Sequence, residues 1–259
     1  MDRNGTKWSR EETILAFELY CRTAFSKISS KNPEVIALAQ LIGRTPGSVA
    51  LKMHNLAHYD PKLQDRNVTA MSHTSKLDKE IFFEFSEKWL DLSYQAQVIR
   101  ASIQNLELPK IIDIGDIESI PPGEYREAVT KARIGQYFFR TAILNSYGNK
   151  CCITGVEQTA LLNASHIKPW SVCDEQTERT NPRNGLCLNA LHDRAFDRGL
   201  ITIDNKYRII VSEKIRKTHM DEDTKAWFLG YENKQISLPD KFLPSKEFIE
   251  YHNDMVFLG

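Results

Sequence analysis

A change of hydrophobic pattern near residue 150 constrains the fold of this chain more than any other feature. Before it, apolar residues recur at helical spacing. After it come a short strand, "ALLNASHI", a polar loop, a second strand, "GLCL", and a short helix, "NALHDRAFDRG". This order predicts a ββα unit, and "LITIDNKYRIIVS", which alternates around an Asp-Asn-Lys turn, predicts a hairpin after it.

Three short helices are predicted in the first 60 residues. Ser9 and Glu12 have the spacing of a capping box at the start of the first helix. Pro33 stands in the first turn of the second helix, which Gly43 ends, and Thr45 caps the third. Three helices with a tight turn between the last two describe a helix-turn-helix-like bundle.

Two motifs in this bundle resemble the Myb/SANT-like tri-helical domains, over roughly residues 6–58. They are "WSREE" at the first helix and "GRTPGSVALKMHNL" at the turn and third helix. The resemblance implies that the third helix lies against duplex DNA. The side chains that it places there are Arg44, Ser48, Lys52 and His54. A protein-docking or dimerising bundle is the alternative, because the segment is not strongly basic.

The acidic stretch "IIDIGDIESIPPGE", punctuated by Pro-Pro-Gly, marks the predicted domain boundary. We expect a helical DNA-binding or docking domain over residues 1–110, a linker over 111–123 and a second domain over 124–259. The first domain includes the amphipathic piece "SKLDKEIFFEFSEKWLDL", and the second begins with one long helix. The predicted fold class is therefore α+β.

Three motifs follow one another in the second domain: "ASHIKPW", "NPRNGLCL" and "LHDRAFDRGLI". In this order and spacing they resemble the HNH endonucleases, from about Arg126 to Val211. The resemblance implies a ββα-metal core at about residues 160–200. It places a histidine at the end of the first strand, an asparagine before the second strand and metal ligands on the helix.

The resemblance assigns catalytic roles to His166 and Asn184. Hydrolysis of a phosphodiester needs a water made nucleophilic and a cation that offsets the charge of the phosphate. A neutral imidazole is a suitable base near pH 7, so His166 is predicted to activate the water. Asn184 would tie the loop backbone and hold the histidine in place, with Asn181 as the alternative. Without the neighbouring motifs, a histidine after a strand is more often structural.

Two predictions for the metal ligands remain open. Asp193 and Asp197 are four residues apart, so both carboxylates lie on one face of a helix and suit Mg²⁺ or Mn²⁺. His192, at the family's last histidine position, is the alternative ligand or a phosphate donor. Ser165 stands where many HNH enzymes have an aspartate, which removes one usual ligand. Structural Zn²⁺ is not expected, because Cys151 and Cys152 are adjacent.

The predicted function is a metal-dependent DNA endonuclease used in restriction or phage defence. Lys168, Arg183 and Arg194 flank the site and are candidates for binding phosphates. The alternative for each is a solvated surface position without a role in binding. A double-strand break would then need a homodimer or two successive nicks. The alternatives are a regulatory DNA-binding protein with a degenerate HNH fold, which Ser165 favours, and an RNA substrate.

Composition limits the other function classes. The chain has 259 residues, a formal net charge of zero and 41% hydrophobic residues, so binding to nucleic acid must depend on local patches. No run approaches the roughly 18 apolar residues of a membrane span, and the polar start differs from a signal peptide. Five irregularly spaced cysteines favour reduced thiols. We therefore expect a cytoplasmic protein without a membrane partner.

Overall fold

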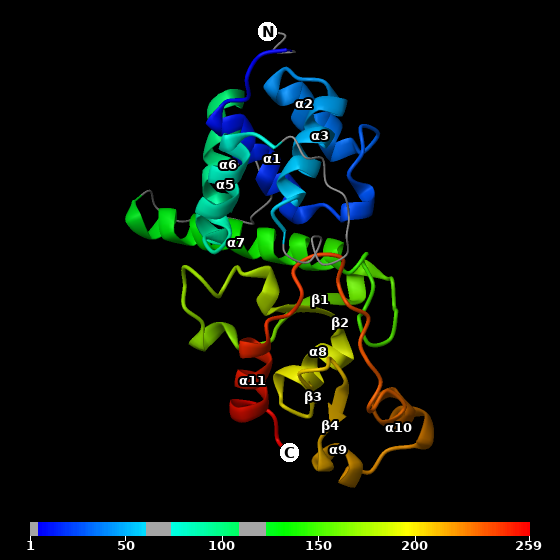
Figure 1. Ribbon diagram of the computed structural model, residues 1–259. Helices are drawn as coiled ribbons and strands as arrows, with labels where there is room; N and C mark the ends of the chain where they lie inside the picture. Colours follow the sequence, from blue (N-terminus) through cyan, green and yellow to red (C-terminus); the bar gives the residue numbers. More distant parts are fainter. Residues whose placement is uncertain (1–4, 61–73, 109–122) are drawn as a thin grey trace. The chain divides into compact units, whose positions relative to one another are not determined.

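The computed structural model describes residues 5–60, 74–108 and 123–259, and it is built of helices and two small antiparallel sheets (Figure 1). This mixture confirms the α+β class. The chain divides into two compact units, residues 1–142 and 143–259. The predicted linker, residues 111–123, lies almost wholly outside the described residues. Within those residues, no helix is both long and apolar enough to cross a membrane.

The first unit is helical, and its three predicted N-terminal helices are confirmed. Its helices are α1 (Arg10–Arg22), α2 (Pro33–Ile42), α3 (Pro46–Ala57), α5 (Lys76–Phe85), α6 (Trp89–Gln104) and most of α7 (Glu124–Ser146), with a short 3-10 turn, η1 (Phe25–Lys27). The Ser9 hydroxyl accepts from the Glu12 amide, and the Glu12 carboxylate accepts from the Ser9 amide at 2.9 Å. Gly43 ends α2 with φ 70°, a left-handed conformation that glycine adopts without strain.

Helix α1 forms the centre of the first unit, because its apolar residues contact α2, α3, α5 and α6. Phe17 is fully buried, with its ring 5.1 Å from that of Phe82 and 6.5 Å from that of Trp89. The predicted amphipathic piece that contains Phe82 is split between α5 and α6, since the backbone leaves the helix at Lys88 (φ −121°, ψ 54°). Burial of each such ring contributes roughly 1.5–3 kcal/mol.

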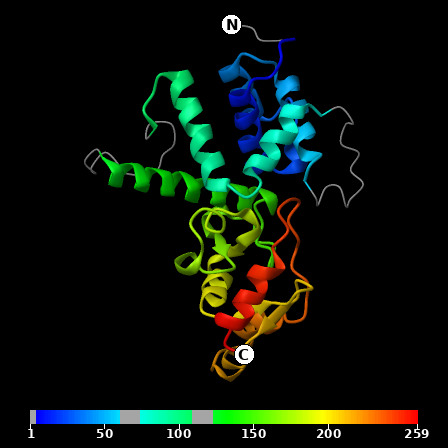
Figure 2. The same cartoon turned by 60° about the vertical axis from the view of Figure 1, so that its left-hand side comes forward.

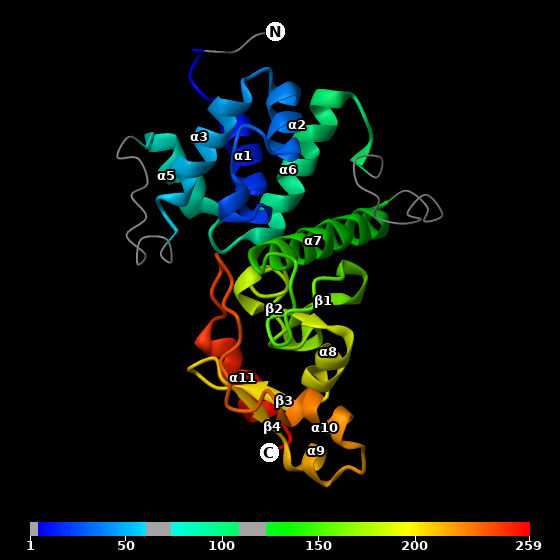
Figure 3. The same cartoon turned by 90° about the vertical axis from the view of Figure 1, so that its right-hand side faces the viewer.

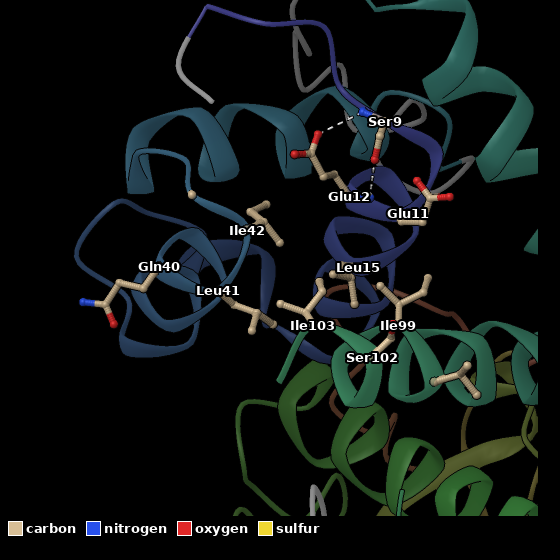
Figure 4. Close-up of a pocket in the computed structure, with 12 residues that line it drawn as sticks. Ser9, Glu11, Glu12, Leu15, Gln40, Leu41, Ile42, Ile99, Ser102 and Ile103 are labelled. Atoms are coloured by element: carbon tan, nitrogen blue, oxygen red, sulfur yellow. Dashed lines mark hydrogen bonds between the residues drawn. The ribbon is translucent and has the colours of Figure 1, made fainter. Parts of the chain in front are cut away.

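A cavity of about 680 Å³ opens between α1, α2 and α6 of the first unit (Figure 4). Its apolar wall is formed by Leu15, Leu41, Ile99 and other aliphatic side chains, and Glu11 and Ser9 lie at its polar edge. None of the residues predicted for catalysis lines this cavity. The residues predicted for catalysis lie in the second unit.

The second unit contains the predicted ββα order. Strand β1 (Leu162–His166) pairs antiparallel with β2 (Gly185–Asn189), with His166 opposite Gly185. Helix α8 (Ala190–Asp197) follows β2 directly and contacts both strands. The predicted hairpin is confirmed as β3 (Ile201–Ile203) and β4 (Ile209–Val211). The remaining elements are η3 (Thr159–Leu161), η4 (Trp170–Val172), η5 (Pro182–Asn184), α9 (Glu213–Lys217), α10 (Glu222–Leu229) and α11 (Lys246–Met255).

Gly199 connects α8 to β3 at a point where no other residue fits. Its φ is +66°, and a Cβ at this position would lie 2.0 Å from the carbonyl oxygen of Val256. The Gly199 carbonyl also accepts from the Leu258 amide at 2.9 Å. The end of the chain is therefore held against the turn that ends the ββα unit.

Helix α11 lies beside the β3–β4 hairpin, as the red helix and yellow strands of Figure 2 and the labels of Figure 3 show. Its His252 is almost fully buried and stacks on Phe196 of α8, with ring centroids 3.8 Å apart. One ring nitrogen lies 2.8 Å from the Thr202 hydroxyl and the other 3.1 Å from the Phe196 carbonyl oxygen. Burial lowers the pKa of His252 from 6.5 to about 4, although the Phe196 carbonyl opposes this shift.

We expect this histidine to make the second unit acid-sensitive. The neutral ring is buried, so the unfolded chain binds a proton first as the pH falls below 6.5. The neutral His252 ring makes its full contribution to the free energy of unfolding above that pH. This contribution, about 3 kcal/mol, is lost as the pH falls toward 4. The measurement is the free energy of unfolding in urea between these pH values. The variant His252→Gln serves as the control, since it should lose this part of the pH dependence; an unchanged slope would contradict the assignment.

Candidate active site

His166 lies at the end of β1, where the antiparallel pairing with β2 stops. Its Nε2 is 2.9 Å from the carbonyl oxygen of Arg179, and its ring meets the Trp170 ring edge to face at 5.4 Å. A carbonyl oxygen only accepts hydrogen bonds, so Nε2 carries the proton in this arrangement. In the neutral ring Nδ1 is then the basic nitrogen.

Burial lowers the pKa of His166, and the Arg179 carbonyl and the charge of Asp193 partly offset that shift. A histidine with a pKa below 6.5 is largely neutral at pH 7. The ring is therefore in the protonation state that a general base requires.

Asn184 is fully buried, and its side-chain amide ties together the loop that follows β1. Its Oδ1 accepts from the Lys168 amide at 2.8 Å, and its Nδ2 donates to the Lys168 carbonyl at 3.2 Å and to Cys173 Sγ at 3.3 Å. The Asn184 carbonyl also accepts from the amide of Ile167, the residue after His166. Asn181, the alternative, caps the short η5 turn through the Arg183 amide. Of the two asparagines, Asn184 is the one bonded next to the histidine.

One α8 carboxylate, Asp193, acts electrostatically on the other, Asp197, and on His166. The pKa of Asp197 is raised by partial desolvation and then by the negative charge of Asp193. Asp193 also acts electrostatically on His166, in the direction that raises its pKa. Two carboxylates that repel each other in this way are relieved by a bound cation.

Asn163 is a residue of the site that the sequence analysis missed. Its Nδ2 donates to Asp193 Oδ2 at 2.7 Å, from two strand positions before Ser165. The contact orients one carboxylate oxygen and leaves the second to other partners. The spacing in β1 was the available signal, since Asn163 and Ser165 share a face of the strand.

The donor set fits a hard divalent cation only with help from water and phosphate. Among the described residues, no group of three or more His, Cys, Asp or Glu side chains is placed to hold a metal ion. Ser165 adds no charge; its hydroxyl is buried and has no hydrogen-bond partner within the described ranges. Mg²⁺ is commonly bound through one or two carboxylates plus waters and substrate phosphates, which matches Asp193 and Asp197. All five cysteines are buried thiols.

His192 is held inside the second unit. Its Nε2 is 2.8 Å from the Trp227 carbonyl oxygen, its Nδ1 is 3.1 Å from Asn189 Oδ1, and the side chain is buried. The ring also packs against Trp227, Phe228 and Tyr231. Both nitrogens are thus occupied by protein oxygens, and this placement favours fixing α8 to α10 over metal binding.

The cations predicted around the site differ in their surroundings. Lys168 Nζ is 2.6 Å from Glu178 Oε2 and also lies over the Tyr251 ring, so its charge is partly balanced. Arg183 and Arg194 are exposed. Of the three, these two arginines have the accessibility that contact with a phosphate requires.

In the first unit, the predicted DNA contacts Arg44 and Lys52 are buried. Arg44 is 2.7 Å from the Glu12 carboxylate, Lys52 is 2.5 Å from that of Asp78, and both cations lie over the Trp8 ring. The Arg44 ion pair joins the turn before α3 to α1, and the Lys52 ion pair joins α3 to α5. The prediction that they contact a duplex is not supported by this placement, and the resemblance to Myb/SANT-like domains stays a prediction.

Comparison with known families gives one result for the site. Residues 151–204, which include β1, β2, α8 and β3, match the sequence model described as HNH endonuclease. The match confirms the resemblance drawn from the three motifs. No curated protein matches the chain in a sequence search.

Proposed function

We propose that this chain, whose residues 151–204 form an HNH endonuclease domain, is a metal-dependent nuclease that hydrolyses phosphodiester bonds in double-stranded DNA. The observation that carries the proposal is the arrangement at the end of β1. There a neutral His166, oriented by the Arg179 carbonyl, lies within the electrostatic influence of Asp193. A base near a carboxylate that can hold a cation suits hydrolysis of a phosphate ester.

In this proposal His166 takes a proton from water at Nδ1. The resulting hydroxide attacks phosphorus, the bond from phosphorus to the leaving oxygen breaks, and that oxygen takes a proton from solvent. The Arg179 carbonyl stabilises the ring as it becomes cationic, because its lone pair accepts from Nε2. Asn184 acts as a positioning residue, because its side chain binds the backbone amide and carbonyl of Lys168, two residues after His166.

Asp193 and Asp197 would hold the cation, and Mg²⁺ or Mn²⁺ suits their oxygen ligands. Such a cation supplies positive charge that offsets the charge developing on the phosphate and leaving oxygen. Asn163 would keep Asp193 in one orientation. His192 would fix the position of α8 through the Trp227 carbonyl.

We propose restriction or phage defence as the biological role, in the cytoplasm, with either a homodimer or successive nicks giving a double-strand break. The second candidate is a DNA-binding regulator with a degenerate HNH fold. It is favoured by the uncharged Ser165 and by the two-carboxylate donor set in the described part of the chain. RNA as a substrate is a third candidate.

The test is incubation of the full chain with supercoiled plasmid and Mg²⁺ or Mn²⁺. We expect nicked circles that disappear when EDTA removes the cation and return when excess Mn²⁺ is added. The same protein should leave a duplex RNA of matched length intact. Plasmid that stays supercoiled with both cations would contradict the nuclease proposal and favour the regulator, and cleavage of the RNA alone would favour the third candidate.

A further inference from the structure

Helix α7 carries a regular series of arginines. Arg126, Arg133 and Arg140 repeat at intervals of seven residues, so they differ by only about 20° per step around the helix. Helix α7 has 23 residues, and at 1.5 Å per residue it is about 34 Å long. The three guanidinium groups therefore form one stripe, with about 10 Å between neighbours.

The opposite side of α7 packs within the first unit. Lys131 Nζ is 2.9 Å from Asp91 of α6, and the Phe138 ring stacks on Trp89 with centroids 6.3 Å apart. The only acidic residues of the helix, Glu124 and Glu127, lie about 180° and about 120° from Arg133 around the axis. No acidic residue of α7 therefore lies within the stripe.

The arginine side of α7 is accessible. Arg140 is exposed, Arg126 is half-buried, and the Tyr137 side chain between them is 43% exposed. Within the described residues, neither Arg126 nor Arg140 is joined to a carboxylate by a salt bridge. The chain as a whole has no net charge, so a stripe of one sign on one helix marks a local electropositive surface.

We propose that Arg126, Arg133 and Arg140 bind the phosphate backbone of duplex DNA along α7. This inference rests on the proposed function for its ligand. A duplex carries a negative phosphate at every step of each strand, so a row of guanidinium groups on one helix has several anionic partners within reach. Helix α7 leads through a few residues into the HNH segment at Cys151, so a duplex bound on it is tethered to the cutting domain. DNA binding in the first unit is therefore assigned to α7. Arg44 and Lys52 of the N-terminal bundle, which the sequence had suggested for this role, are buried.

The test uses the full chain with His166→Ala, so that DNA is bound without being cut. Arg126→Glu and Arg140→Glu are combined, and affinity for a short fluorescein-labelled duplex is measured by anisotropy over a range of salt. We expect binding to weaken roughly tenfold or more. We also expect the slope of log affinity against log salt to fall by about two, one for each phosphate contact.

The matched control is Lys27→Glu with Lys31→Glu, which makes the same change of charge at two exposed lysines of the first unit. A milder pair, Arg126→Gln with Arg140→Gln, and thermal melting of each variant exclude loss of folding as the cause. If the arginine variants bind DNA with the same affinity and salt dependence as the lysine control, the proposal that the stripe binds DNA is wrong. Because the readout is binding, this result is distinct from failure of the nuclease proposal, which depends on cleavage by the unmodified chain.

Discussion

Replacing His166 by alanine should reduce plasmid nicking by about a hundredfold to ten-thousandfold while DNA binding is retained. The reason is that general-base catalysis contributes about this factor. The His166 ring contacts the Arg179 carbonyl and the Trp170 ring, whereas β1 and β2 are paired through their backbones, so removal of the ring should leave the strands paired. Initial nicking rates and duplex affinity measure the two effects separately.

The matched control for this variant is His219→Ala, because His219 is an exposed histidine of the same unit. It should nick at the rate of the unmodified chain. If His166→Ala nicks as fast as this control, the assignment of the base is wrong. Loss of both cleavage and DNA affinity in His166→Ala would instead indicate that the ring holds the loop in place.

Replacing Asp193 by asparagine should reduce cleavage with both Mg²⁺ and Mn²⁺ by at least about tenfold. The substitution keeps an oxygen that can accept from Asn163 Nδ2, so the fold and the orientation of the side chain are preserved. It removes one of the two negative charges that would hold the cation. Even the loss of a group that only supports a metal ligand lowers metal affinity or activity by about tenfold to a hundredfold, so the loss of a ligand's charge should cost at least as much. A shift of the Mn²⁺ concentration needed for half-maximal nicking measures the loss.

Asp223→Asn is the control for this second prediction, since Asp223 is an exposed carboxylate of α10. It should leave the Mn²⁺ requirement unchanged. The raised pKa of Asp197 should also fall back toward its ordinary value in Asp193→Asn, because the neighbouring negative charge is gone. Undiminished nicking in both Asp193→Asn and Asp197→Asn would rule out the carboxylate pair as the metal site.

Local signals in the sequence were enough to place many of the elements. Ser9 and Thr45 cap the helices that follow them, Pro33 is the first residue of α2, and Gly43 ends that helix. The alternation of the strand segments predicted both hairpin pairings. These features could be predicted because caps and strand alternation depend on neighbours a few residues away.

Contacts between distant residues could not be predicted in the same way. Arg44 precedes and Lys52 stands in a helix that resembles a DNA-reading helix, yet their partners Glu12 and Asp78 are 32 and 26 residues away. The same holds for Asn163 with Asp193, and for His192 with the Trp227 carbonyl. A cation or histidine in a helix has the same local pattern whether it faces solvent or a buried carboxylate.

Short-range periodicity and motifs in order were enough to predict most of the helices, the ββα unit and its histidine. Which charged groups are available depends on contacts between elements that are far apart in the sequence. The tertiary structure placed Arg44 and Lys52 in ion pairs, His192 between two oxygens and Asn163 against Asp193. The physical reason is that a side chain's charge and hydrogen bonds are balanced by whatever the fold brings beside it, and in this chain those partners come from other elements.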